Sequence, residues 1–204
     1  MGEQHYVITI SRQFGSLGRS IAQKTAEILG IYFMDRDIVE ETARRMGLAL
    51  SEIGDREEQS KSQGRYFYRK FPLGMAPAPI EDEIFEVQSN IIRDCAAKQD
   101  CIIVGRCAEY VLRNHERRLS FYIRAPYEAR LQNCIETLHM EAAQAQKMIH
   151  DVDIARAYYR RRYIQTLDRL PDYTDCDIIL DSSRFGVEQS AQIIAATART
   201  ALGI

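Results

Sequence analysis

The sequence predicts a three-layer α/β/α fold, in which helices cover both faces of a five-stranded parallel sheet. Short apolar segments alternate along the chain with longer segments whose apolar residues recur every three or four positions. A strand, a helix and a second strand in succession form a parallel pair with the helix packed on the sheet. The length of 204 residues suits one domain better than two, so residues 1–204 are expected to form a single domain.

Five segments rich in β-branched and aromatic residues have the length of buried strands. They are Tyr6–Ser11, Ile31–Met34, Cys101–Val104, Leu119–Ile123 and Asp177–Leu180. Right-handed crossovers bring the carboxyl ends of all parallel strands to one edge of the sheet, where open α/β sheets bind ligands. Polar residues follow every strand at this edge: Gln13–Ser20, Asp35 and Arg36, Gly105 and Arg106, Arg124, and Asp181–Ser183.

Amphipathic spacing predicts the helices between these strands. They are Ile21–Leu29, Arg36–Met46, Glu81–Lys98, Ala108–Arg113, an almost entirely helical stretch over Tyr127–Leu170, and Val187–Ala201. The segment Leu50–Pro79 is different, because it is charged and polar, then aromatic over Tyr66–Phe71, then rich in proline. We expect a protruding, partly mobile insertion there. Its aromatic residues either stack on a nucleobase or pack onto the sheet or a second subunit, which leaves a homodimer open.

Composition excludes several classes of function. The net charge of −2 gives no electrostatic case for a nucleic-acid partner. The five cysteines have no metal-ligand spacing, and no apolar run approaches the about 20 residues that span a membrane. The polar start does not resemble a signal peptide, so we expect a cytoplasmic protein. Of the 27 basic residues 22 are arginine, which reflects either surface ion pairs or phosphate recognition.

The segment Phe14–Ser20, between the first strand and the first helix, has the layout of a phosphate-binding loop. Glycines allow positive φ angles, and the helix N-terminus adds unpaired N–H groups and a positive dipole end. Gly18 and Ser20 match the second glycine and the hydroxyl of the Walker pattern G-x-x-x-x-G-K-[ST], whereas Gln13 and Arg19 replace its first glycine and its lysine. The alternative is an ordinary strand-to-helix turn.

A phosphate-binding loop assigns a role to each of its residues. Its backbone N–H groups would hold the donor phosphates, Arg19 would reach the terminal phosphates, and the Ser20 hydroxyl would face Mg²⁺. The predicted nucleotide-binding residues are Gly15, Ser16, Leu17, Gly18, Arg19 and Ser20.

Three segments together resemble the cytidylate kinase-like proteins, a branch of the nucleoside monophosphate kinases. They are Ile8–Ala22, Phe33–Arg36 and Ile102–Ala108. The resemblance implies a P-loop kinase fold with an acceptor cover, here 36–98, and a lid over the donor, here 141–170. It implies ATP and Mg²⁺ as cofactors and transfer of the γ-phosphate to a small phosphate-bearing acceptor, with CMP or dCMP as the natural choice.

The resemblance also implies an acceptor site. Arg106, and with it Arg36, would hold the acceptor phosphate. Asp35 either takes part in this site or the Mg²⁺ site, or it N-caps the helix that follows. Two residues depart from the family pattern, because Arg19 stands in place of the loop lysine and Cys107 in place of an aspartate.

Arginines on the last part of the long helical segment are the remaining catalytic candidates beside Arg19. Arg156 and Arg160 share a helical face, and Arg161 lies one step round from it. Closure of this helix would bring them to the transferred group. Alternatively, Arg160–Arg162 form a solvated helical face paired with acids such as Asp153. Two other functions stay open: a nucleotide-binding module with little turnover, and a kinase for a non-nucleotide small molecule.

Overall fold

The computed structural model describes residues 5–49, 80–164 and 176–204, and these form a single parallel sheet with helices on both faces. The strands are β1 (Val7–Arg12), β2 (Tyr32–Met34), β3 (Cys101–Val104), β4 (Arg118–Arg124) and β5 (Ile178–Asp181), in the order β2-β3-β1-β4-β5. Every neighbouring pair is parallel, and Ile10 of the central strand pairs with Val104 on one side and Phe121 on the other. The predicted five-stranded parallel sheet is confirmed.

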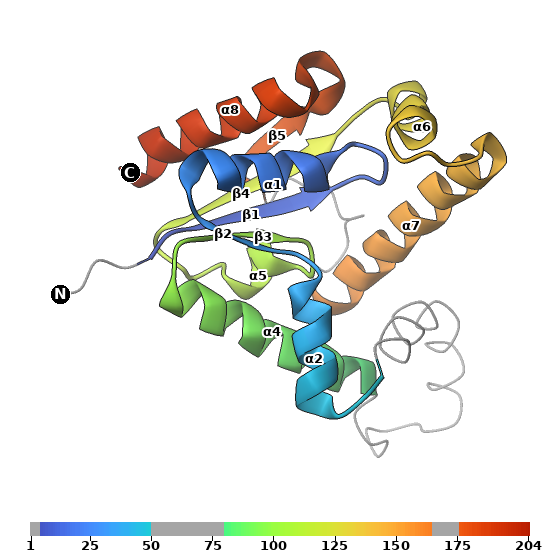
Figure 1. The fold of residues 1–204 in the computed structure, drawn as a ribbon. Helices are drawn as coiled ribbons and strands as arrows, with labels where there is room; N and C mark the ends of the chain where they lie inside the picture. The colour runs from blue at the N-terminus through green and yellow to red at the C-terminus, as the bar shows by residue number, and fades with distance from the viewer. Residues whose placement is uncertain (1–4, 50–79, 165–175) are drawn as a thin grey trace.

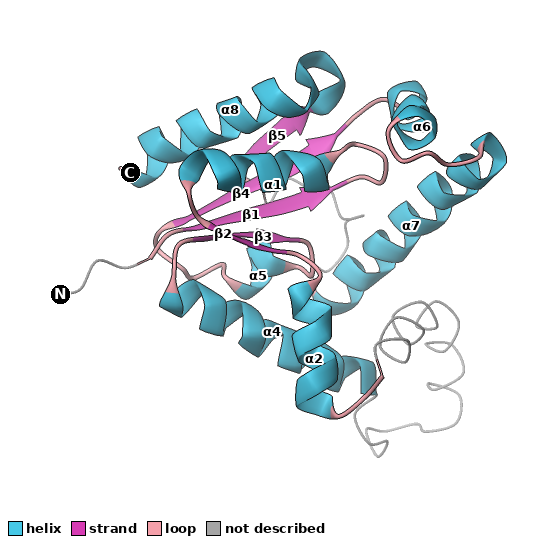
Figure 2. Ribbon diagram, viewed as in Figure 1, coloured by secondary structure: helices cyan, strands magenta, loops and turns pink. Residues whose placement is uncertain are grey.

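Helices complete the three predicted layers. They are α1 (Gly18–Leu29), α2 (Asp37–Met46), α4 (Ile80–Lys98), α5 (Ala108–Val111), α6 (Tyr127–Glu136), α7 (Ala142–Tyr163) and α8 (Ser182–Leu202). Helices α1 and α8 cover one face of the sheet, and α4 and α5 cover the other (Figures 1 and 2). Helices α6 and α7 lie beyond the carboxyl ends of β1 and β4, so they stand at the edge where the polar residues gather (Figure 1).

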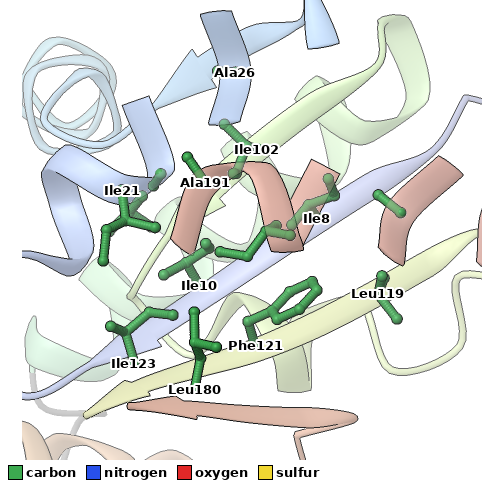
Figure 3. Packing of buried hydrophobic residues seen from close by; sticks show 14 residues of the cluster. Ile8, Ile10, Ile21, Ala26, Ile102, Leu119, Phe121, Ile123, Leu180 and Ala191 are labelled. Atoms are coloured by element: carbon green, nitrogen blue, oxygen red, sulfur yellow. The ribbon is translucent and has the colours of Figure 1, made fainter. Parts of the chain in front are cut away.

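The alternation of side chains along β1 divides the core into two layers. Ile8 and Ile10 point to the face under α1 and α8, where they meet Ile21, Phe121 and Ala191 (Figure 3). Val7 points to the opposite face, in a cluster with residues of β3, α4 and α5. Because both faces are apolar, the chemistry has to lie at the carboxyl edge of the sheet.

The stretch Tyr127–Leu170, predicted to be almost entirely helical, shows a break in its described part, 127–164, where α6 and α7 are separate helices. Residues 137–141 separate α6 from α7, and His139 there has a left-handed φ of 55°. The Met140 N–H donates to the Cys134 carbonyl at 3.0 Å and closes the turn. Cys134 of α6 packs against Ala145 and Ile149 of α7, so the break lets the two helices share a small core.

Helix α8 begins earlier than its apolar pattern predicts. The helix starts at Ser182, because the Asp181 carboxylate accepts the Ser183 N–H at 3.1 Å and caps it. A kink at Gly186, with φ of 66°, separates this first turn from the predicted part over Val187–Ala201. The Ser183 hydroxyl also donates to the Asp181 carboxylate, at 2.6 Å, and this hydrogen bond is the main cause that lowers the pKa of Asp181.

Three expectations concern residues outside the described ranges. The whole insertion Leu50–Pro79, with its aromatic residues, lies there, and so do the middle of the acceptor cover and residues 165–170 of the lid. Among the helices of the described ranges, none has both the length and the apolar character that a membrane crossing needs.

Candidate phosphate-binding site

The loop between β1 and α1 has the backbone conformation of a phosphate cradle. Gly15 and Leu17 have φ angles of 76° and 58°, in the left-handed region. Gly15 has no space for a side chain, since a Cβ there would lie 2.8 Å from the Arg130 carbonyl oxygen and 2.9 Å from Cys134 Sγ. Glycine is therefore needed at position 15 for its left-handed φ and for the absence of a side chain.

The N-terminus of α1 offers unpaired donors. Within the described ranges no oxygen accepts the backbone N–H groups of Gly18, Arg19 or Ser20, and no side chain caps the helix. The first turn of α1 also contains no acidic residue. Such a helix start is suited to an anion, and a phosphate group of ATP fits it chemically.

Side chains of α6 and α7 hold the opposite side of the loop. Asp153 of α7 accepts the Phe14 N–H at 2.8 Å and forms an ion pair with Arg130 of α6. Arg130 also donates to the Phe14 carbonyl at 3.3 Å, and Asn133 donates to the Gly15 carbonyl at 2.9 Å. The loop is thus fixed from the side by two helices that follow it by more than 100 residues in the chain.

Gln13, which stands in place of the first Walker glycine, ties the loop to the end of β4. Its side-chain Oε1 accepts the Ala125 N–H at 3.1 Å, and its backbone N–H donates to Ile123 at 3.0 Å. Its carbonyl accepts the Ser16 hydroxyl at 2.8 Å. Ser182 of α8 donates in turn to the Ser16 carbonyl at 2.8 Å. These hydrogen bonds fix the loop although Gln13 replaces the first glycine of the Walker pattern.

Asp35, at the end of β2, faces the loop instead of capping α2. Its carboxylate lies 2.5 Å from Arg19 Nε and 3.8 Å from Arg12 Nη2. The residue before α2 is Arg36, which is exposed and makes no capping hydrogen bond through its side chain. The capping role left open for Asp35 is therefore not what the structure shows.

Arg12 belongs to this site although the sequence reasoning passed over it. Its side chain is 20% exposed, and its guanidinium lies against Gly105 at the end of β3. Burial, followed by the charge of Arg156, lowers the pKa of Arg12 to about 9, and Asp35 opposes this shift. Arg12 therefore remains protonated at neutral pH. The signal was available, since a charged residue ends the central strand of the predicted sheet.

The turn after β3 is strained. Gly105, Arg106 and Cys107 have φ angles of 78°, 54° and 52°, so two residues other than glycine adopt the left-handed conformation in succession. Each costs about 1–2 kcal/mol, and such turns concentrate at functional sites. Burial raises the pKa of the Cys107 thiol, so Cys107 does not replace the charge of the aspartate that the family pattern has here.

Of the three helical arginines predicted to act together, the structure brings one to the end of β1, beside the loop. Arg156 donates to the Arg12 carbonyl at 2.9 Å. Arg160 forms an ion pair with Glu109 of α5, and both side chains are only 5% exposed. Arg161 is exposed. The catalytic roles of the three remain predictions.

The described residues fit a magnesium ion held mainly by a nucleotide. Among them no cluster of three or more histidine, cysteine or acidic residues could bind a metal alone. Mg²⁺ in kinase sites takes only one or two protein ligands and completes its shell with phosphate oxygens and water. Ser20 is exposed at the start of α1, where one such ligand would be needed.

Comparison with known proteins gives one family and several related structures. The cytidylate kinase-like family matches residues 7–184. An uncharacterised protein from Eubacterium ventriosum has a TM-score of 0.71 at 21% identity, covering 96% of this chain and 99% of its own. Shikimate kinases from Bacteroides thetaiotaomicron and from Acinetobacter baumannii, the latter in complex with shikimate, have TM-scores of 0.55 and 0.51.

The two shikimate kinases are 13% and 14% identical to this chain, and each alignment covers 98% of it. It also covers 99% and 96% of the respective kinase. At this identity the likeness concerns the fold. Comparison with the curated proteins gave no match.

Proposed function

The chain belongs to the cytidylate kinase-like family, and we propose that it transfers the γ-phosphate of ATP to a small phosphate-bearing acceptor, most naturally CMP or dCMP. The observation that carries this proposal is the start of α1, where three backbone N–H groups lack acceptors in the described ranges and Arg19 adjoins them. Kinase ancestry and a nucleotide-binding fold agree with this position. The cytoplasm, where such nucleotides are abundant, is the compartment we propose.

On the donor side the loop would position the phosphates. The N–H groups from Gly15 to Arg19 would bind the β-phosphate, and the Arg19 guanidinium would span the β- and γ-phosphates. Asp35 holds Arg19 at 2.5 Å, so Arg19 has to exchange this carboxylate for a phosphate. Magnesium bound with ATP would neutralise charge on the phosphates, and Ser20 would supply one of its ligands.

On the acceptor side three residues would bind the substrate. Arg106 lies on the strained turn after β3, and Asp35 with Arg36 follows β2, the neighbouring strand. We propose that Arg106 and Arg36 bind the acceptor phosphate. Asp35 would then orient the acceptor or help to hold the metal ion.

Charge on the transferred group would be stabilised by arginines of α7. Arg156 already lies at the end of β1. Arg160 would have to leave Glu109, and Arg161 would have to approach from the surface. Closure of α7 over the loop is the movement that this assignment requires.

The test measures ADP release from Mg-ATP with CMP, dCMP, UMP, AMP and GMP as acceptors. We expect acceptor-dependent release, and we expect Arg19→Ala to lower ATP affinity or turnover at least tenfold, about 1.4 kcal/mol. Lys24→Ala on the same helix is the matched control, since Lys24 lies at the surface of α1 and pairs with the exposed acids Glu27 and Glu188. Unchanged nucleotide binding and turnover in Arg19→Ala would contradict the loop assignment.

A second candidate is a nucleotide-binding module with little turnover. The ion pair between Arg19 and Asp35 supports it, because the pair neutralises the only charged side chain in the loop Gln13–Ser20. ATP binding without release of ADP to any acceptor would favour this candidate. Including shikimate among the acceptors tests a non-nucleotide substrate, which the related kinase structures suggest.

A further inference from the structure

We propose that Arg12 is a binding residue for the phosphate group of the acceptor, at the carboxyl edge of the sheet between β1 and β3. This inference rests on the proposed kinase function and adds to it a residue that neither the glycine loop nor the family pattern assigns.

The Arg12 guanidinium has donors without acceptors. Its side chain is four-fifths buried, yet in the ranges that the structure describes no oxygen accepts a hydrogen bond from it. Its nearest carboxylate oxygen, on Asp35, is 3.8 Å away. A guanidinium carries five N–H donors in a fixed plane, and no Arg12 nitrogen is among the fully buried atoms of the described residues that lack a partner, so these donors stay accessible to a ligand. A ligand oxyanion is the partner that this geometry lacks.

The fold keeps space for this side chain at two glycines. A Cβ on Gly105 would collide with Arg12 Nη1, and a Cβ on Gly18 would lie 2.7 Å from Arg12 Cβ. The stem of Arg12 therefore lies against the start of α1, and its charged end lies against the turn after β3. This position is between the loop that would hold the donor and the turn that carries Arg106.

The charges around Arg12 favour a dianion over a carboxylate. Arg156 and Arg106 are close enough to act on the Arg12 charge, and the acids that oppose them are Asp35 and Glu109. Both acids already bind another arginine, since Asp35 contacts Arg19 and Glu109 contacts Arg160. Each acid near Arg12 is thus shared with a second arginine, and neither neutralises Arg12 alone. A phosphate monoester supplies two negative charges and planar oxygen pairs that match a guanidinium.

The experiment measures inorganic phosphate binding by calorimetry after a non-hydrolysable ATP analogue with Mg²⁺ has filled the donor site. We expect Arg12→Gln to weaken phosphate binding at least tenfold and to leave affinity for the ATP analogue within twofold. Glutamine retains the Cβ and Cγ atoms that pack against Gly18. Arg12→Lys keeps the charge but not the planar pair of donors, so its phosphate affinity should lie between those of the wild type and Arg12→Gln. Arg93→Gln, an exposed arginine of α4, should bind both ligands like the wild type.

Two results would overturn the proposal. One is equal phosphate affinity in Arg12→Gln and the wild type, with folding confirmed by an unchanged melting temperature. The other is wild-type protein that takes up the ATP analogue and no phosphate. Failure of the kinase function would appear differently, as loss of ATP binding or as absence of ADP release. The affinities for CMP and cytidine then test whether the group at Arg12 is the phosphate of a nucleotide. In that case Arg12→Gln should weaken binding of CMP and leave binding of cytidine unchanged.

Discussion

Arg12 and Arg160 are both largely buried arginines at the same end of the molecule, but their surroundings differ. Arg160 of α7 is in an ion pair with Glu109, which also accepts the Ser11 hydroxyl at 3.2 Å. Arg12 at the sheet edge shares one carboxylate at 3.8 Å with Arg19. The arginines therefore differ in their partners: Arg130 and Arg160 pair with an acid of another helix, whereas Arg12 and Arg19 share one carboxylate, which under our proposal leaves Arg12 for a ligand.

The largest expected effect concerns the buried ion pair between Arg160 and Glu109. Glu109→Gln should lower the free energy of unfolding by about 3–5 kcal/mol, because it leaves the Arg160 charge buried without its carboxylate. Urea denaturation of the variant and the wild type measures it. The double variant Glu109→Leu with Arg160→Met should recover most of the loss, since it removes both charges. A loss below about 1 kcal/mol in Glu109→Gln is typical of an exposed ion pair, and it would show that the Arg160 charge does not depend on the Glu109 carboxylate.

A smaller effect tests the support of the loop from α7. Asp153→Ala removes the acceptor of the Phe14 N–H and the partner of Arg130, so it should cost about 1–3 kcal/mol of unfolding free energy. We also expect weaker binding of the ATP analogue, because the loop loses its fixed geometry. Asp151→Ala is the matched control two residues away, where the aspartate pairs with an exposed histidine. Equal affinity in both variants would show that the loop keeps its shape without α7.

A third effect sharpens the charge argument at the sheet edge. Asp35→Asn removes the carboxylate that Arg12 and Arg19 share, so inorganic phosphate should bind several-fold more tightly, about 0.5–1 kcal/mol. Calorimetry at low ionic strength is the measurement, because salt screens the effect. Asp37→Asn changes the charge equally but affects an aspartate that binds Tyr32, so it should leave phosphate affinity unchanged. Weaker phosphate binding in Asp35→Asn would contradict the charge argument.

The smallest expected effect on stability concerns Arg161. This side chain is exposed beside the buried Arg160, so Arg161→Ala should change the free energy of unfolding by less than about 0.5 kcal/mol. A fall in kcat at unchanged stability would support its predicted role in closure of α7. An unchanged kcat would contradict that role and favour the alternative, a solvated arginine on the surface of α7.

The strands and the loop could be predicted because their signals are local. Apolar runs located all five strands to within one residue at every end, and Gly15, Gly18 and Ser20 located the loop. The break at 137–141 was missed because no glycine or proline occurs in it. There His139 takes the left-handed conformation that glycine usually signals, and the packing of Cys134 against Ala145 and Ile149 accompanies the turn.

The partners of the charged residues could not be predicted, because they join distant parts of the chain. Asp153 was considered as a partner for Arg160–Arg162 on its own helix, yet it binds Arg130 and the Phe14 N–H. Arg12 was passed over because the predicted strand ended at Ser11, whereas β1 continues to Arg12 and delivers its side chain to Gly105. Such pairings depend on the tertiary arrangement of whole elements, which a sequence pattern does not specify.

The amide of Phe14 is bonded to a side chain of α7 and to no neighbouring strand. Its hydrogen can exchange with deuterium from the solvent only when that bond opens, so the exchange rate follows the separation of α7 from the loop. Deuterium uptake by a peptide that contains Phe14, measured by mass spectrometry, would therefore report any separation of α7 from the loop. The measurement needs no attached label, chromophore or known substrate.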